Sequence, residues 1–194
     1  MRAQVRGQDP HLTAHCSGAT VVAGAAGGVA LELRLWDTLY HIAWPEVRAV
    51  EAASGQPCRA DVEAALLYYL CTADGTPLAG QWIGFQELPE GAFYGRAFQG
   101  YSGDELVRHF RDDLEAFRRA AERAGGAPLP LSDAGFSFLT LPQVPLTIVY
   151  WLGEEGIPTR AQVLFDRAAS HYLPTDVLAI LGAQLIRRTI RAAE

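Results

Sequence analysis

Hydrophobic and polar residues alternate along the first quarter of the chain. In the segment 29–36, valine and leucine occupy every second position, and Glu32 and Arg34 occupy two of the positions between them. A period of two is typical of a strand with one buried face, so this part of the chain predicts a small antiparallel meander. Its strands are expected at residues 20–23, 29–36 and 39–44, and its turns at 24–28 and 37–38.

Helices are predicted where apolar residues recur at spacings of three and four. One helix is predicted at residues 57–72, where residues 64–71 are apolar nearly all round, which is typical of a buried helix. Residues 104–124 follow helical spacing, and Ser102 and Glu105 before and within them have the pattern of a capping box. A third helix is expected after Pro174, with Thr175 or Asp176 as its N-cap.

Runs rich in β-branched and aromatic residues predict the strands of the C-terminal half, at 136–141, 146–152 and 161–165. The fold class is therefore α+β, with an antiparallel or mixed sheet made of the N-terminal meander plus the C-terminal strands. This sheet is expected to pack against about three main helices. No stretch has the composition of a linker between domains, so we predict a single domain over residues 1–194.

The segment 82–101 combines aromatic residues with glycines. That mixture does not suit a regular amphipathic helix, and we expect an irregular loop that either packs over the core or lines a pocket. Its aromatic residues are Trp82, Phe85, Phe93, Tyr94, Phe98 and Tyr101.

Composition narrows the possible partners. The 194 residues carry a net charge of −6, whereas nucleic-acid binding depends on basic patches that neutralise phosphates. No apolar run reaches the roughly 18 residues of a membrane helix, and the N-terminus lacks the apolar core of a signal peptide. The three cysteines are far apart, which suits a reducing compartment. We therefore expect a soluble cytoplasmic protein, with neither nucleic acid nor membrane as a partner.

Two observations limit the chemistry. All 16 basic residues are arginines, which excludes a P-loop lysine, a Schiff-base lysine and a lysine general base from this chain. Asp9 and Pro10 predict a short helix that places His11 and His15 on one face, at a spacing seen in zinc sites. No carboxylate or cysteine completes such a site locally. His11 and His15 are weak metal candidates, and no metal site is expected from this chain alone.

One short stretch near the C-terminus brings together an acid, a serine, a histidine and a phenol: Asp166, Ser170, His171 and Tyr172. These residue types carry general acid–base and nucleophilic catalysis. The G-x-S-x-G turn of a hydrolase nucleophile is absent from the sequence, and Asp166 is equally natural as a turn residue. Asp166, His171 and Tyr172 are therefore candidate catalytic residues, with turn and capping roles as the alternative.

Several runs resemble those of one known family. They are Leu66–Leu70, Ala73–Leu78, Gly80–Leu88, Leu164–Asp166 and Ser170–Pro174. The combination is similar to an uncharacterised prokaryotic family, domain of unknown function 3786, over nearly the whole chain. The resemblance implies a cytoplasmic protein common in anaerobes, some of whose relatives are fused to a cysteine-rich iron–sulfur domain of the kind seen in corrinoid proteins. This chain lacks that cysteine-rich part, and the resemblance implies no activity.

Three hypotheses follow. In the first, the protein is a ligand-binding or accessory domain for a flat apolar cofactor such as haem or a corrinoid, and His171 is an axial ligand. An iron–sulfur or corrinoid protein is then a possible partner. In the second, it is an enzyme with acid–base chemistry at Asp166, His171 and Tyr172. In the third, it is an interaction protein without a small ligand. The residues expected to hold a cofactor are Trp82, Phe85, Phe93, Tyr94, Arg96, Arg160 and His171.

Overall fold

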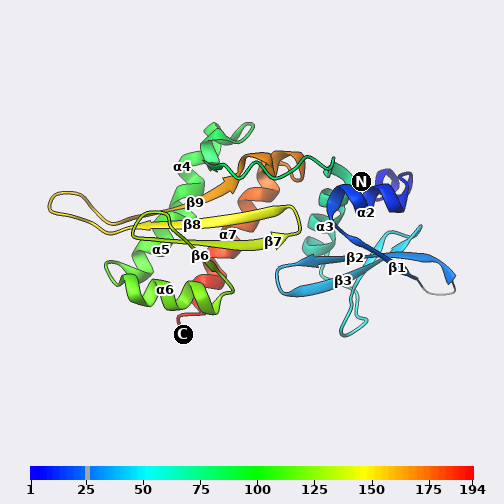
Figure 1. The fold of residues 1–194 in the computed structure, drawn as a ribbon, viewed down its shortest axis with the longest axis horizontal. Coiled ribbons are helices and arrows are strands. Elements are labelled where there is room, and N and C mark those ends of the chain that lie inside the picture. Colours follow the sequence, from blue (N-terminus) through cyan, green and yellow to red (C-terminus); the bar gives the residue numbers. More distant parts are fainter. Residues whose placement is uncertain (25–26) are drawn as a thin grey trace. The chain divides into compact units, whose positions relative to one another are not determined.

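A computed structural model describes residues 1–24 and 27–194, and these divide into two compact units (Figure 1). Unit 1 comprises residues 1–78, 139–144 and 168–174, and unit 2 comprises residues 79–138, 145–167 and 175–194. Each unit combines helices with its own antiparallel sheet, so the predicted α+β class is confirmed, with two sheets in place of the one that was expected. The single domain over residues 1–194 stays a prediction.

The predicted meander forms most of unit 1. It gains one short strand that the sequence pattern did not indicate, which gives a four-stranded antiparallel sheet in the order β1-β2-β3-β4. The alternation predicted its buried face correctly, because Leu31, Leu33 and Ile42 are at most 1% exposed. The predicted turn at 24–28 contains Ala25 and Ala26, which lie outside the described residues. The strands are β1 (Thr20–Ala23), β2 (Val29–Leu35), β3 (Thr38–Trp44) and β4 (Arg48–Glu51).

The main helix of unit 1 is α3 (Ala60–Thr72), shorter at its start than predicted but buried as its apolar sequence indicated. Its Tyr69 is fully buried, and the phenol is still satisfied. The Tyr69 hydroxyl donates to the carbonyl of Ser17 at 2.6 Å and accepts from the amide of Gln143 at 3.1 Å. Burial raises the pKa of Tyr69 well above its ordinary value. Tyr69 therefore acts as a neutral crosslink within the core of unit 1.

Unit 2 contains most of the predicted C-terminal strands, together with the helices between residues 91 and 123 and the C-terminal helix. Its five-stranded sheet has the order β5-β9-β8-β7-β6. Phe117 of α6 is fully buried and stacks on Tyr150 of β8, with the ring centroids 4.7 Å apart. The strands are β5 (Trp82–Gly84), β6 (Ala127–Leu129), β7 (Ala134–Leu141), β8 (Val144–Trp151) and β9 (Arg160–Asp166). The helices are α4 (Gly91–Tyr101), α5 (Gly103–Phe110), α6 (Leu114–Arg123) and α7 (Thr175–Arg191).

The segment 82–101 is not the irregular loop that its composition predicted. It forms β5, a 3₁₀ turn at Phe85–Glu87, and the regular helix α4. The glycines explain the difference, because a Cβ atom at Gly91 would lie only 1.9 Å from the carbonyl oxygen of Phe85. Gly91 therefore brings the start of the helix into close contact with the preceding turn, and it does not break the helix.

The helix predicted at 104–124 is in fact two helices, α5 and α6. The chain breaks at Arg111, whose φ is 52°, and restarts where the Asp113 side chain accepts the amide of Ala116 at 2.8 Å. The predicted capping box is not made, because the Ser102 hydroxyl donates to the carbonyl of Phe98 within its own turn. Together with α1 (Arg2–Arg6) and α2 (Pro10–Ser17), these helices exceed the three that were expected.

Candidate functional site

His171 lies in unit 1, at the end of a 3₁₀ helix that spans Arg167–His171. Its Nδ1 atom is 2.7 Å from Oδ2 of Asp74 and 3.1 Å from Oγ1 of Thr76. The side chains of the two paired residues are half-exposed, at 48% for His171 and 51% for Asp74. We refer to these two residues as the Asp74–His171 pair. A histidine oriented by a carboxylate is a common arrangement in metal-binding and catalytic sites.

The turn after α3 places the carboxylate. Oδ1 of Asp74 accepts the backbone amide of Thr76 at 2.9 Å, which leaves Oδ2 for the histidine. Gly75 between them has φ +80°, a conformation that glycine adopts without strain. Tyr172, beside the histidine, donates its hydroxyl to the carbonyl of Thr76, and its own carbonyl accepts the hydroxyl of Thr72. Hydrogen bonds on both sides of Asp74 therefore link its segment to the segment that carries His171.

These contacts determine the charge of the site. Hydrogen bonds from Thr76, and then the one from His171, lower the pKa of Asp74 to about 2. The carboxylate is thus ionised and can only accept, so Nδ1 of His171 carries the proton that it donates. In the neutral ring, the lone pair is then on Nε2. Among the described residues, no side chain or backbone group hydrogen-bonds to that Nε2 atom.

The lowered pKa of Asp74 predicts an acid-sensitive contribution to stability. A folded pKa of about 2 lies below the ordinary value of 3.8, so the contribution is complete above about pH 4 and is lost as the pH falls through 2. We expect Asp74→Asn to be less stable than the parent at pH 6, and the gap to narrow steadily between pH 4 and pH 2. Urea unfolding across this range measures it. A gap that is constant with pH would contradict the prediction.

Asp166 has a different environment from the one expected of an acid partner for His171. It ends β9 in unit 2 and is 1% exposed. Its two oxygens accept the backbone amides of Ala79 at 2.9 Å and Gly80 at 2.8 Å. The acid that the structure brings to His171 is Asp74. A catalytic role for Asp166 stays a prediction.

The residues expected to hold a cofactor lie mostly in unit 2. Trp82 is in β5 and pairs with Asp166 across the sheet, and Phe85 is buried against Phe98 with ring centroids 4.2 Å apart. Phe93 and Tyr94 project from α4 and are 87% and 67% exposed.

The two arginines of the same set are both exposed. Arg96 also lies on α4, and Arg160 is at the start of β9. The guanidinium of Arg160 lies over the ring of Trp151, 4.5 Å from its centroid. Arg160 is thus engaged in a cation–π contact within its own unit.

The histidines at the N-terminus lie on α2, which begins as predicted with Asp9 accepting the amide of Leu12 at 2.9 Å. His11 and His15 are both exposed on this helix. Across residues 1–24 and 27–194, no group of three or more His, Cys, Asp or Glu side chains is arranged to hold a metal ion. Within the same residues, no helix has the combined length and apolar character that a membrane span needs.

Sequence reasoning missed Asp74 and Thr76 as members of the site. The Asp-Gly step at residues 74–75 predicted a turn, and the turn is present. Its carboxylate, however, meets a histidine 97 positions away, and no spacing in the chain encodes that contact. Only the fold shows which of the acids reaches His171.

A family model described as a domain of unknown function, DUF3786, matches residues 9–188. The chain belongs to DUF3786. The match includes α2, both sheets and most of α7, so the DUF3786 region contains Asp74, Thr76, His171 and Tyr172. No curated protein and no solved structure matches this DUF3786 chain.

Proposed function

We propose that this protein is a binding or accessory domain in which His171 offers its Nε2 atom as an axial ligand to the metal of a flat cofactor, such as haem or a corrinoid. The observation that carries the proposal is the 2.7 Å contact between Nδ1 of His171 and the carboxylate of Asp74. Metal-ligating histidines nearly always donate their other ring N–H to a carboxylate or carbonyl, which fixes the tautomer and raises the basicity of the ligand.

The donor set fits this role for one reason. The Asp74–His171 pair supplies a single nitrogen ligand, and a metal held by one protein ligand needs its other positions filled by the cofactor. A tetrapyrrole or corrin ring fills four of them. The exposed positions of Phe93 and Tyr94 on α4 give no support for aromatic walls around the ring, so the proposal rests on the Asp74–His171 pair. When bound, such a cofactor would supply the metal chemistry, and the pair would orient and tune the ligand.

His41 shows why His171 is the better candidate. It is also paired with an acid, but it uses the distal atom Nε2, which is 2.9 Å from Oε1 of Glu32. The nitrogen left over in His41 is Nδ1, which lies next to the backbone and is harder for a bulky cofactor to approach. In His171 the proximal nitrogen is occupied and the distal one is open. His41 is therefore a matched control in the same unit.

The test is a titration of the purified protein with haemin, and separately with aquocobalamin, followed by visible absorption. We expect a saturating spectral shift at one equivalent of one of them. His171→Ala should abolish the shift, and Asp74→Asn should weaken binding about tenfold or more, the usual cost of losing a carboxylate that orients a metal ligand. His41→Ala should leave the titration unchanged.

Two results would reject the proposal. One is a parent spectrum that does not change with either cofactor. The other is a shift that persists in His171→Ala, because binding would then use another residue.

A second function is favoured by the same geometry. An ionised carboxylate that holds Nδ1–H leaves Nε2 as a general base, the role a histidine has in many hydrolases. In this alternative, His171 takes a proton from a substrate or a water molecule, and Asp74 and Thr76 orient the ring. A substrate screen in which turnover is lost in both His171→Ala and Asp74→Asn, with no cofactor bound, would favour the enzyme.

A further inference from the structure

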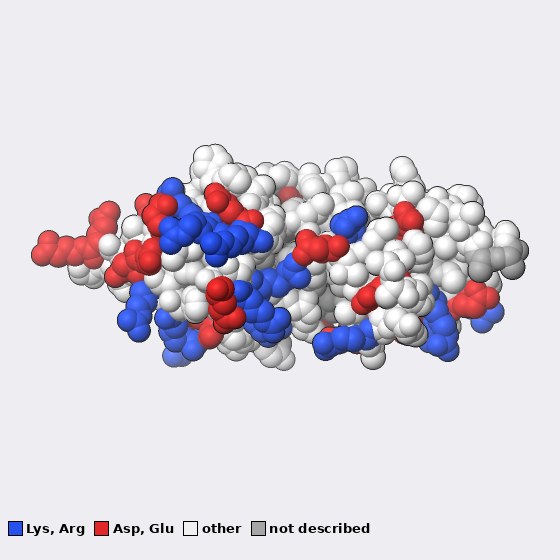
Figure 2. Space-filling model, turned by 90° about the horizontal axis from the view of Figure 1, so that it is seen from below, with Lys and Arg blue, Asp and Glu red and all other residues white. Residues whose placement is uncertain are grey.

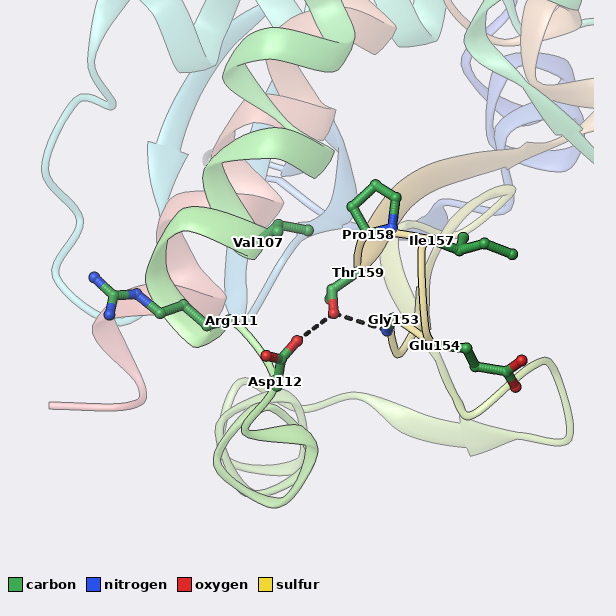
Figure 3. A pocket seen from close by; sticks show the side chains of 8 residues that line it. All are labelled: Val107, Arg111, Asp112, Gly153, Glu154, Ile157, Pro158 and Thr159. Atoms are coloured by element: carbon green, nitrogen blue, oxygen red, sulfur yellow. Dashed lines mark hydrogen bonds between the residues drawn. The ribbon is translucent and has the colours of Figure 1, made fainter.

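Unit 2 contains a surface pocket that is independent of the Asp74–His171 pair. It lies between the end of α5 and the loop that joins β8 to β9, and it has a volume of about 490 Å³ (Figure 3). That volume is within the range of sites for small organic molecules. Its lining includes Val107, Arg111, Asp112, Glu154, Ile157 and Thr159.

The pocket has an apolar part and a carboxylate. Val107, Ile157 and Pro158 provide the apolar surface. Asp112 lies beside them, with Oδ1 accepting the hydroxyl of Thr159, whose oxygen in turn accepts the amide of Gly153 at 2.8 Å. This chain of hydrogen bonds fixes the orientation of the carboxylate (Figure 3). Oδ2 of Asp112 accepts no hydrogen bond from any residue that the structure describes.

The charge at the pocket is mainly negative. Glu154 adds a second carboxylate to the lining, and no described residue forms an ion pair with it. The one cation of the lining is Arg111, and in Figure 3 its side chain extends away from Asp112 and Thr159. A ligand in the pocket can therefore contact the free oxygen of the Asp112 carboxylate without contacting the guanidinium of Arg111.

The backbone holds Asp112 in place. Arg111 has φ 52° and ψ −123°, a conformation that a side chain with a Cβ rarely adopts. It is kept there by two hydrogen bonds, because its amide donates to the carbonyl of Val107 at 2.8 Å and its carbonyl accepts the hydroxyl of Tyr150 at 2.6 Å. The carboxylate of the next residue is thus presented by a rigid turn, which reduces the entropy that a ligand must overcome.

We propose that this pocket binds a small organic cation, with a primary ammonium or guanidinium group on a short aliphatic chain. The cationic group donates to Oδ2 of Asp112, and the chain lies on Val107, Ile157 and Pro158. An ionised acceptor makes a stronger hydrogen bond to a charged donor than to a neutral one. A cation is therefore favoured over an alcohol of the same length, and a carboxylate is disfavoured.

The probe is n-hexylammonium chloride, added to the ¹⁵N-labelled full chain and followed by NMR chemical shifts. We expect saturable shifts at the amides of Val107, Asp112, Ile157 and Thr159. Asp112→Asn should weaken the affinity at least tenfold, because the asparagine keeps an acceptor for Thr159 and loses only the charge. Glu155→Gln removes a charge from the same loop at a residue outside the lining, and it should change the affinity less than twofold.

Comparisons with the unmodified protein make the test independent of any variant. 1-Hexanol and sodium hexanoate have the same chain length, and we expect each to cause less than a tenth of the saturable shift at equal concentration. Equal shifts with 1-hexanol would overturn the proposal, since the site would then be merely apolar. It is also overturned if hexylammonium causes no saturable shift at these amides, or if Asp112→Asn binds it as tightly as the parent.

Discussion

Replacement of Asp166 by alanine is expected to destabilise the protein by about 3 kcal/mol, because hydrogen bonds to an ionised acceptor contribute about 1.5–3 kcal/mol each. Asp166 is 1% exposed, and its oxygens accept the amides of Ala79 and Gly80. Removal of the carboxylate leaves both donors without their acceptor inside a poorly hydrated site. For a chain of this length, the melting temperature should fall by roughly 10 °C.

Urea unfolding of the parent and the variant measures this loss. Asp166→Asn should recover only part of it, because the asparagine offers one acceptor oxygen and turns its NH₂ toward the second amide. Glu155→Ala is the matched control, since it removes an exposed carboxylate from the same unit and should change stability by less than about 0.5 kcal/mol. If Asp166→Ala unfolds like the parent, the two backbone hydrogen bonds contribute little.

The same variants separate structure from function. If the Asp74–His171 pair binds a cofactor, Asp166→Asn should retain the spectral shift under conditions in which it is folded. Asp74→Asn should weaken it while the fold remains intact. The opposite pattern would favour a functional role for Asp166.

The sequence predicted the strands better than the helices, and the reason is physical. A strand with one buried face shows its period of two in a few residues, as Leu31 and Leu33 do. The break between α5 and α6 depends instead on Arg111, whose positive φ is maintained by contacts with Val107 and Tyr150. Arg111 itself does not mark such a turn, since arginine is a good helix former.

The candidate site shows the same difference between local and non-local features. Its local half could be predicted, because an Asp-Gly step after an apolar helix indicates a turn and His171 stands out in a stretch of chemically capable residues. The contact between Asp74 and His171, 97 positions apart, could not be predicted. Seven acids in unit 1 precede the turn, and the residue pattern does not rank them against Asp74. They are Asp9, Glu32, Asp37, Glu46, Glu51, Asp61 and Glu63.

The structural roles of the glycines were the hardest feature to predict, because each role depends on which atoms of the fold lie close to that glycine. A Cβ atom at Gly103 would lie 2.0 Å from the carbonyl oxygen of Ala161 in β9, whereas one at Gly100 would meet nothing within 4 Å. The first glycine allows α5 to pack directly on the sheet. The second merely sits near the end of α4.

Gly103→Ala is therefore expected to destabilise the protein by about 3 kcal/mol or more, since overpacking against backbone cannot be relieved by a change of rotamer. Gly100→Ala should stabilise it by about 0.5 kcal/mol, because alanine favours the helix and has room there. Urea unfolding of both variants, three positions apart in the chain, measures the contrast. Equal effects would mean that α5 can move away from β9 at little cost.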